Sequence, residues 1–591
     1  FIVNDPGEGA QAKRRSAAVI VDHLMPPLAR AEAHGPFAEL ETLIDEYHLA
    51  LGADPRRRDD LERDILDRAA RHGIDRDLSI GGADTGEALR AIDAHLCDIK
   101  EMQIRDGLHV LGTSPAASAR IETLAAIARI PRTGGRPADA SLVRAIAEDL
   151  GLVRFDPLLP DRAAPWTGPK PESLRALDDA PWRTESDTAE RLETLARRCI
   201  EDALAGTLPQ ETGAATRAVL DFVVTELVPA LDRSGADEMR GLLAALDGRF
   251  VPPGPAGSPS RGRPDALPTG RNFYTVDTRA VPTEAAWRIG RKAAEALVMR
   301  YLQDEGAWPR SVALTVWGTS NMRTGGDDIA EVLALIGAEP VWEAGTGRVT
   351  GFRVLTLADL KRPRVDVTLR ISGLFRDAFP EQIDLIDSAI RAVAARDEPD
   401  DANPLAAARR SGEASARIFG AAPGAYGSGI EAMMALGAWD GRGELAEMFL
   451  GASGYAYGSG EEGADASDAL RSRLSAIDLV VQNQDNREHD ILDSDEYHQH
   501  QGGLALAAEY LSGAAPRLYH GDHALAEQPV IRPLTEEIGR VVRGRATNPK
   551  WIAGVMRHGF RGAAEMAATV DYLAGFAATT HAVGDHHFDA L

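Results

Sequence analysis

The sequence is poor in cysteine, the residue on which disulfide frameworks and thiolate metal sites depend. Its 591 residues include two cysteines, Cys97 and Cys199, which are too few for either kind of structure. No apolar run approaches the ~18–20 residues that a membrane-spanning helix needs. The chain opens with FIVNDPGEG, which has neither Met nor the basic n-region of a signal peptide. These absences predict a cytoplasmic protein that does not cross a membrane.

Several catalytic motifs are also missing. The sequence has no G-x-x-x-x-G-K-[ST] phosphate-binding loop, no H-E-x-x-H, no G-x-S-x-G and no C-x-x-C. Any nucleotide hydrolysis therefore belongs to a partner, and the hydrolase and thiol redox classes have little support.

Basic residues are in the minority, with 65 Lys and Arg against 90 Asp and Glu and a formal net charge of −25. A field of this sign repels nucleic acids and anionic membranes. It attracts cations and basic protein surfaces. We therefore predict no nucleic acid and no membrane among the partners.

The length and the 44% hydrophobic content are enough for roughly three to five domains. The opening Phe-Ile-Val followed by Asn-Asp-Pro-Gly looks like a strand end inside a domain, so we expect a fragment of a longer protein. The fold class that we predict is mixed α/β and multidomain, with helical regions flanking a parallel α/β layer. The predicted parts are a mainly helical region with a truncated start (1–250), a Pro/Gly-rich linker (251–272), an α/β domain (273–410) and a mainly helical domain (411–591).

Two strand–loop–helix units define the predicted α/β layer. The apolar run Ser311–Gly318 is followed by a helical pattern over Gly326–Gly337. The run Arg364–Ser372 is followed by a helical pattern over Phe379–Ala395. Successive units of this kind indicate parallel strands, whose ligands bind at the carboxyl ends.

Arginines follow both predicted strands. Arg323 lies in the first loop, and Arg370 and Arg376 lie at the end of the second strand and in its loop. Arginine and backbone N–H groups at a helix start suit the carboxylate groups of a ligand. The alternative is a salt-bridged loop with an aspartate at the helix start, and the two interpretations are about equally supported.

The acidic–histidine stretch, NQDNREHDILDSDEYHQHQGG (residues 483–503), contains six carboxylates and three imidazoles. His489 and Asp493 are four residues apart, so they would share a face if they were helical. Carboxylates and imidazoles together can hold a first-row divalent ion with open coordination positions. Crowded carboxylates also raise one another's pKa, which suits proton acceptance. The alternative is a solvated acidic turn.

Longer strings in the sequence resemble one known family, the large subunit of aerobic cobaltochelatase, which is related to the porphyrin-binding H subunit of magnesium chelatase. The resemblance extends in order over essentially the whole chain and corresponds to about the carboxyl-terminal half of a full-length member. The strings EHDILDSDEY and MRTGGDD favour the cobalt branch over the magnesium branch. The strings that carry the resemblance are NDPGEGAQAKRR, CDIKEMQIRDGLH, LPTGRNFYTVD, VWGTSNMRTGGDDIAEVLALIGAEPVW, VDVTLRISGLFRDAFPEQIDLID, DNREHDILDSDEY and NPKWIAGVMRHGFRGAAEMAATVDYL.

This resemblance implies the ATP-dependent insertion of Co²⁺ into hydrogenobyrinic acid a,c-diamide, a step of cobalamin biosynthesis. Co²⁺ would be a substrate, and ATP and Mg²⁺ would be used by two partner subunits. One partner would be an AAA+ ATPase, and the other would carry an integrin-like domain. The alternatives are the large subunit of a magnesium or other metal chelatase, and a tetrapyrrole-binding scaffold without insertion activity.

The residues that we predict to act in metal insertion come from the acidic–histidine stretch and from the strand ends. Glu488 and His489 are the candidates for proton transfer. The candidates for metal binding are Glu488, His489, Asp493 and Asp495. The candidates for binding the carboxylates of the corrinoid are Arg323, Arg370, Arg376 and Arg487. His498 and His500 are left out, because the family commonly has aromatic residues there.

Overall fold

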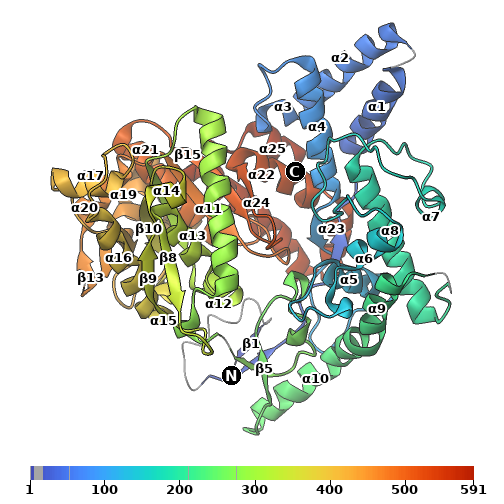
Figure 1. The fold of residues 1–591 in the computed structure, drawn as a ribbon, viewed down its shortest axis with the longest axis horizontal. Coiled ribbons are helices and arrows are strands. Elements are labelled where there is room, and N and C mark those ends of the chain that lie inside the picture. The colour runs from blue at the N-terminus through green and yellow to red at the C-terminus, as the bar shows by residue number, and fades with distance from the viewer. Residues whose placement is uncertain (1, 5–17, 52–53, 210–211, 275, 459) are drawn as a thin grey trace.

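The structure of the chain is a computed structural model that describes residues 2–4, 18–51, 54–209, 212–274, 276–458 and 460–591. Most of the NDPGEGAQAKRR string lies outside the described residues. Figure 1 shows an α/β part built around a large sheet on the left and a mainly helical part on the right. The carboxyl-terminal helices lie between the two parts.

An eight-stranded sheet of order β13-β12-β11-β10-β7-β14-β15-β16 forms the centre of the α/β part. The strands from β11 to β15 along this order are parallel, and antiparallel strands complete both edges. The bounds are β7 Ser311–Val316, β10 Asp366–Ile371, β11 Ile418–Gly420, β12 Tyr455–Gly458, β13 Glu461–Asp465, β14 Leu479–Gln484, β15 Arg517–Asp522 and β16 Val530–Pro533.

The direction of the connections reverses at β7. Strands β10 and β11 lie on one side of β7, whereas β14 and β15 lie on the other. In a parallel sheet such a reversal leaves a crevice at the carboxyl ends of the two strands, here β7 and β14, where ligands bind. The acidic–histidine stretch begins in β14, so the topology places it at this crevice.

Helices cover both faces of the sheet because alternate side chains of each strand point to opposite faces. In β7, Val312 and Leu314 pack with α11, α13 and α16, whereas Ala313 packs with α18, α19, α20 and α21. The elements around the sheet are α11 Glu284–Glu305, α12 Gly318–Thr324, α13 Asp327–Ile336, β8 Ala338–Trp342, β9 Val349–Val354, α14 Leu357–Leu360, α15 Gly373–Ala378, α16 Pro380–Ala394, α17 Pro404–Ser411, α18 Ile430–Leu436, α19 Arg442–Ser453, α20 Ser467–Leu474 and α21 Gly503–Ser512.

The helical part has two cores of its own, one around α5, α6, α8 and α9 and one around α1, α2 and α4. A four-stranded sheet of order β1-β2-β6-β5 and the β3–β4 pair adjoin it. The bounds are α1 Pro36–Ala50, α2 Pro55–Arg71, α3 Ile74–Asp77, α4 Thr85–Lys100, α5 Ala117–Arg129, α6 Leu142–Asp149, α7 Glu172–Arg175, α8 Glu185–Ala205, α9 Ala214–Phe222, α10 Val228–Leu246, β1 Ile2–Asn4, β2 Ile20–Asp22, β3 Leu28–Arg30, β4 Gln103–Arg105, β5 Pro253–Pro255 and β6 Asn272–Tyr274.

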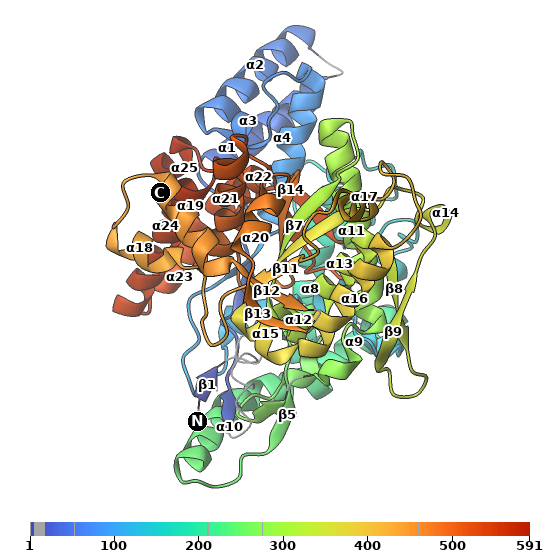
Figure 2. The ribbon, with the colours of Figure 1, turned by 90° about the vertical axis from the view of Figure 1, so that its left-hand side faces the viewer.

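The carboxyl-terminal helices connect the two parts. One core contains Ile104 of β4, Trp317 after β7, Leu492 after β14, and Ile538 and Trp551 of these helices. This core therefore joins the carboxyl edge of the sheet to the helical part, and Figure 2 shows the same ribbon from the side. The helices are α22 Leu534–Val541, α23 Pro549–Met556, α24 Phe560–Thr579 and α25 Asp585–Ala590.

The mixed α/β class and the two predicted strand–helix units are confirmed by β7, α13, β10 and α16. Besides their helices, residues 411–591 also supply β11 to β16 to the same sheet as β7 and β10. β14 is as long as β7, but its apolar run has only three residues, Leu479–Val481, so the hydrophobic pattern does not reveal this strand. The predicted boundary at residue 410 thus runs through one sheet, and the rest of the domain division stays a prediction.

Among the described residues, no helix combines the length and the apolar character that a membrane span requires.

The contact between α11 and α13 gives a test of the packing beside the crevice. A Cβ added at Gly290 of α11 would lie 2.5 Å from the backbone nitrogen of Glu331. Gly290→Ala should therefore lower the free energy of unfolding by about 1–3 kcal/mol, as measured by urea denaturation. Gly451→Ala in α19 is the matched control, because nothing lies within 4 Å of its added Cβ. This variant should be neutral or stabilising by up to about 1 kcal/mol, and equal effects at the two positions would contradict the close packing.

Candidate functional site

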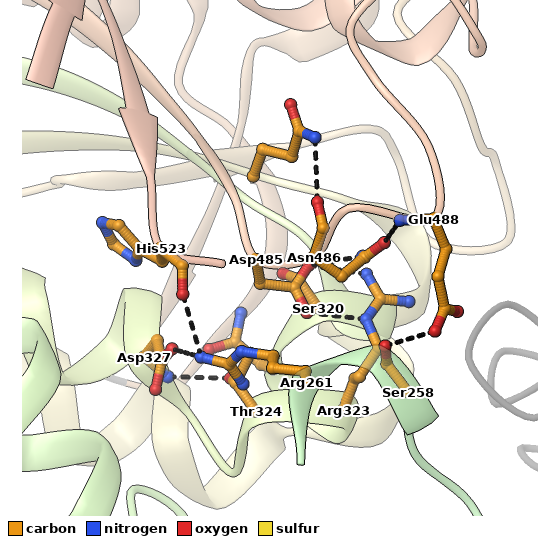
Figure 3. A network of polar contacts seen from close by, with 12 residues as sticks. Ser258, Arg261, Ser320, Arg323, Thr324, Asp327, Asp485, Asn486, Glu488 and His523 are labelled. Atoms are coloured by element: carbon orange, nitrogen blue, oxygen red, sulfur yellow. Dashed lines mark hydrogen bonds and ion pairs between the residues drawn. The ribbon is translucent and has the colours of Figure 1, made fainter. Parts of the chain in front are cut away.

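Residues that follow β7, β14 and β15 converge at the carboxyl edge of the sheet, where the turn Pro259–Arg261 lies against them (Figure 3). This turn belongs to the predicted Pro/Gly-rich linker. Its Ser258 and Ser260 are buried, and β5 of the same segment pairs with β6. The segment is therefore a packed wall of the site.

Arg323 and Asp485 form the central ion pair of this edge. The Arg323 Nε lies 2.6 Å from Asp485 Oδ2, and its Nη2 lies 2.7 Å from Oδ1. Burial by itself would raise the pKa of Asp485. Arg323 and the neighbouring cationic groups together outweigh this effect and hold the pKa below its ordinary value. The pair joins α12, the helix that follows β7, to the loop after β14, so Arg323 organises the crevice.

Arg261 brings the Pro/Gly-rich segment to the start of α13. Its Nη2 lies 2.6 Å from Oδ2 of Asp327 and 3.5 Å from the carbonyl oxygen of His523. Burial raises the pKa of Asp327 to about 7, although Arg261 opposes this shift. Three segments from distant parts of the sequence thus meet at one guanidinium group.

Glu488 points toward the same segment. Its Oε1 accepts hydrogen bonds from the hydroxyl groups of Ser258 and Ser260, the latter at 2.9 Å. Its backbone N–H donates to Oδ1 of Asn486 at 2.8 Å. These two hydroxyl donors fix the orientation of the Glu488 carboxylate.

His489 lies next to Glu488, and its Nε2 is 3.0 Å from the hydroxyl oxygen of Tyr497. Tyr497 is buried and packs edge-on against Trp317, with ring centroids 4.7 Å apart. The aromatic pair therefore holds the imidazole at the carboxyl ends of β7 and β14.

Asp493 and Asp495 have different surroundings from Glu488 and His489. Asp493 pairs with Arg105 of β4, and its Oδ2 accepts the backbone N–H of Asp490 at 2.9 Å. Asp495 accepts a hydrogen bond from Gln499 at 2.7 Å. Residues 485–494 form turns and no helix, so the helical face on which His489 and Asp493 would meet does not exist.

The four predicted metal ligands are not gathered into a preformed ion site. In the described part of the chain, one group of three such residues has ligand atoms within 4.8 Å of one another, namely Asp77, His586 and His587. His587 Nδ1 accepts the backbone N–H of Gly584 at 3.1 Å, so the neutral ring carries its proton on Nε2. Arg543 pairs with Asp77. This group is therefore a hydrogen-bonded anchor of α25, and its proton arrangement does not suit a cation.

Two adjoining cavities open along the crevice. The smaller is lined by Glu488, His489, Asp490 and Asp493. It shares Gln103 and Arg487 with a larger cavity that encloses about 870 Å³ including its mouth.

The larger cavity is lined by cationic side chains from both parts of the chain. The acids among its lining residues are Glu101 and Asp522. Arg487 lies 2.7 Å from Asp522 and keeps about a third of its side chain exposed. The lining arginines are Arg129, Arg162, Arg261, Arg487 and Arg532. Five guanidinium groups around one cavity suit a ligand that carries several carboxylates.

Arg370 and Arg376 do not line either cavity. Strand alternation points Arg370 away from Leu369 and toward α19, where its Nε donates to Ser453 Oγ at 2.9 Å. Arg376 donates to the carbonyl oxygen of Ala422 at 2.8 Å and lies over the ring of Tyr426. Of the four arginines predicted to bind the ligand, Arg487 lines the larger cavity. Arg323 does not line it and instead pairs with Asp485 at the carboxyl edge of the sheet.

Sequence reasoning missed several residues of the site. Arg129 and Arg162 lie in the helical part, where an arginine on a helix or loop carries no signal of its own. Ser258, Ser260 and Arg261 lie in a segment whose Pro, Gly and Ser content indicated a linker. The LPTGRNFYTVD string, a few residues later, was the available hint that this segment has a specific structure.

A buried acidic layer lies behind the crevice on α13. Asn483 of β14 donates one amide hydrogen bond to Asp328 at 2.9 Å and one to Glu331 at 2.6 Å. Burial raises the pKa of Asp328 to about 6 and that of Glu331 to about 8. Glu331 is therefore largely protonated at neutral pH, which removes one charge from the interior.

Comparisons with known proteins identify the family of this chain. A family described as CobN/Magnesium Chelatase matches residues 1–591. The "Aerobic cobaltochelatase subunit CobN" of Sinorhizobium sp is 55% identical over 100% of this chain and 49% of its own length. The protein of the same name from Pseudomonas aeruginosa is 51% identical over 100% of this chain and 49% of its own length. The chain thus spans about half the length of these relatives.

A solved structure has the same fold. The "Catalytic Subunit of Cobaltochelatase from Mycobacterium tuberculosis" superimposes with a TM-score of 0.90 at 41% sequence identity. The match covers 100% of this chain and 49% of that chain.

The protonated state of Glu331 predicts a pH dependence of stability. Its pKa is about 8 in the folded chain against 4.5 for the free residue, so the folded state binds more protons between these values. Stability should fall as the pH rises through this window, by up to about 1.4 kcal/mol per pH unit. Glu331→Gln removes the titration and keeps an acceptor for Asn483. The free energy of unfolding of the variant, relative to that of the wild type, should therefore increase by roughly 2–4 kcal/mol from pH 5 to pH 8. Urea unfolding at both pH values measures this difference.

The matched control is Glu295→Gln on the exposed face of α11, which should show the same difference from wild type at both pH values. Parallel stability profiles for Glu331→Gln and the wild type would mean that Glu331 is ionised in the folded chain.

Proposed function

Because the chain belongs to the CobN/magnesium chelatase family, we propose that it forms the tetrapyrrole-binding catalytic core of a cobaltochelatase. The complete reaction would be the ATP-dependent insertion of Co²⁺ into hydrogenobyrinic acid a,c-diamide in cobalamin biosynthesis. The observation that carries the proposal is the arginine-lined cavity that opens onto Glu488 and His489.

The cavity supplies the binding step. The corrinoid carries several carboxylate side chains, and guanidinium groups pair with carboxylates through two parallel hydrogen bonds. Arg487 is the most suitable partner, because it belongs to both cavities and keeps an exposed surface. Bound in this way, the ligand would present its ring to the smaller cavity.

Glu488 and His489 supply the chemistry. Insertion of Co²⁺ forms bonds to four ring nitrogens and releases the inner proton of the ring. A carboxylate can replace water on the incoming Co²⁺, and a carboxylate or an imidazole can accept a proton. Ser258 and Ser260 orient the Glu488 carboxylate, and Tyr497 orients His489. Asp493 and Asp495 would then influence the Co²⁺ through their charge without binding it directly, because Asp493 pairs with Arg105 and Asp495 accepts a hydrogen bond from Gln499.

The energy source would lie outside this chain. The sequence contains no phosphate-binding loop of the G-x-x-x-x-G-K-[ST] kind, so ATP and Mg²⁺ would be used by partner subunits. These would be an AAA+ ATPase and a subunit with an integrin-like domain, acting in the cytoplasm. Closure of the cavity between the helical part and the sheet is a motion that such partners could drive.

Binding of the tetrapyrrole can be tested separately from its metallation. We expect a saturable absorbance or fluorescence change when this chain is titrated with hydrogenobyrinic acid a,c-diamide. Arg487→Ala should weaken binding by about 1–3 kcal/mol. Arg376→Ala, which removes an arginine outside the cavities, should leave the dissociation constant unchanged. A larger loss at Arg376 than at Arg487 would move the binding site to the edge of the sheet near Tyr426.

The role of Glu488 can be tested with the complete subunit, its partners and ATP. Glu488→Gln should abolish the insertion of Co²⁺ while leaving the dissociation constant of the tetrapyrrole within a few-fold, because the amide no longer accepts a proton. Glu496→Gln, an exposed change in the same stretch, should retain activity. Wild-type insertion by Glu488→Gln would exclude this residue from the reaction. Tight binding without insertion by the wild type would favour a scaffold, and a preference for Mg²⁺ over Co²⁺ would favour a magnesium chelatase.

A further inference from the structure

An exposed apolar stripe runs along α10. Met239, Leu243 and Leu246 recur at spacings of four and three residues, so they share one face of the helix. Phe250 extends the stripe beyond the end of α10. Leu246 is 58% exposed and Phe250 is 81% exposed. The buried residues of α10 include Leu231, Glu238 and Gly241, so the packing of this helix does not depend on the exposed ends of the stripe.

The stripe continues over two neighbouring segments. Met239 lies against Gly112, where a Cβ would be 2.7 Å from its Cγ, and Val110 and Leu111 just before Gly112 are exposed. The same loop contacts the α23–α24 corner, because His558 Nε2 accepts the backbone N–H of Leu108 at 3.0 Å.

At that corner Met556 is exposed and Phe560 is 92% exposed, the most of any large apolar side chain described. In Figure 2, α23 and α24 lie on the left-hand side of the view, and α10 lies below them at the bottom. The members of this apolar band are Val110, Leu111, Met239, Leu243, Leu246, Phe250, Met556 and Phe560.

The charges around the apolar band are paired with one another. Arg249 lies 3.0 Å from Asp247, Arg557 lies 2.7 Å from Asp106, and Arg561 lies 2.7 Å from Glu565. The rim therefore has no surplus of positive charge for an anionic lipid or a nucleic acid. An apolar centre with a balanced polar rim is the composition of a protein–protein interface.

We propose that the apolar band is the surface on which the other half of the family's polypeptide packs. This chain matches 49% of the length of the Sinorhizobium subunit and 49% of the Mycobacterium tuberculosis structure. The remaining half of such a polypeptide is tethered to this one, and interfaces between domains of one chain resemble protein–protein interfaces. The band would hold the two halves together at a distance from the arginine-lined cavity, since none of its residues lines that cavity.

The proposal can be tested by hydroxyl-radical footprinting of methionine side chains. Two samples would be compared, the 591-residue chain alone and a full-length subunit in which this chain replaces the matching half of the Sinorhizobium relative. Met239, at 40% exposure, should be oxidised at least fivefold more slowly in the full-length subunit. Met448 and Met299, at 41% and 42% exposure outside the apolar band, are the matched controls and should keep their rates.

Equal rates for Met239 in the two samples would overturn the proposal. It would also be overturned if Met239 were protected in the 591-residue chain alone, with light scattering showing a dimer, because a second copy would then cover the apolar band.

A substitution provides a second measurement on the same surface. Leu243→Asp combined with Leu246→Asp should leave the Tm of the 591-residue chain within about 2 °C, because both side chains already face solvent. In the full-length subunit the same pair should lower the Tm and increase the rate of proteolysis between the halves several-fold. Leu436→Asp, at the end of α18 and 79% exposed, is the control and should change neither sample. An unchanged full-length subunit would place the interface elsewhere.

Discussion

A buried network of ion pairs between the helical part and the sheet is the interaction on which the candidate site depends. Asp98 of α4 lies 3.0 Å from Arg532 of β16 and 3.0 Å from Arg162, while Asp522 lies 2.7 Å from Arg487. Burial disfavours the Asp98 carboxylate, yet the surrounding arginines hold its pKa below the ordinary value. Loss of one partner would leave an uncompensated charge, at a cost of about 3–5 kcal/mol. The walls of the larger cavity therefore form together.

The same network explains how a chain of net charge −25 presents a cationic cavity. Each arginine that lines the cavity forms an ion pair with a carboxylate, as Arg261 does with Asp327 and Arg487 does with Asp522. These acids hold the guanidinium groups in place without covering all of their donors, since guanidinium has five. A carboxylate ligand entering the cavity would meet donors that are already positioned, so that little side-chain entropy is lost on binding. The acidic exterior would meanwhile favour the approach of a divalent cation.

The α/β layer could be predicted because its signals are local. The apolar run of β7 and the helical pattern of α13 are each contained within a dozen residues, and the run of glycines and arginine between them marks a strand end. Strands β11 and β14 escaped prediction, because they become strands through pairing with β10 and β7. Arg370 shows a second limit, since its position in β10 was predicted correctly but strand alternation turns its side chain toward Ser453.

The sequence by itself determined the family resemblance, the acidic character, and the presence of Glu488 and His489 in one acidic–histidine stretch. Tertiary structure alone decided that Ser258 and Ser260 orient Glu488 from 228 or more residues away, and that Arg129 and Arg162 face Arg487 across one cavity. The reason is physical. Hydrophobic periodicity and turn chemistry act between neighbours along the chain, whereas an ion pair or a cavity wall depends on which distant segments the packing of the cores brings together.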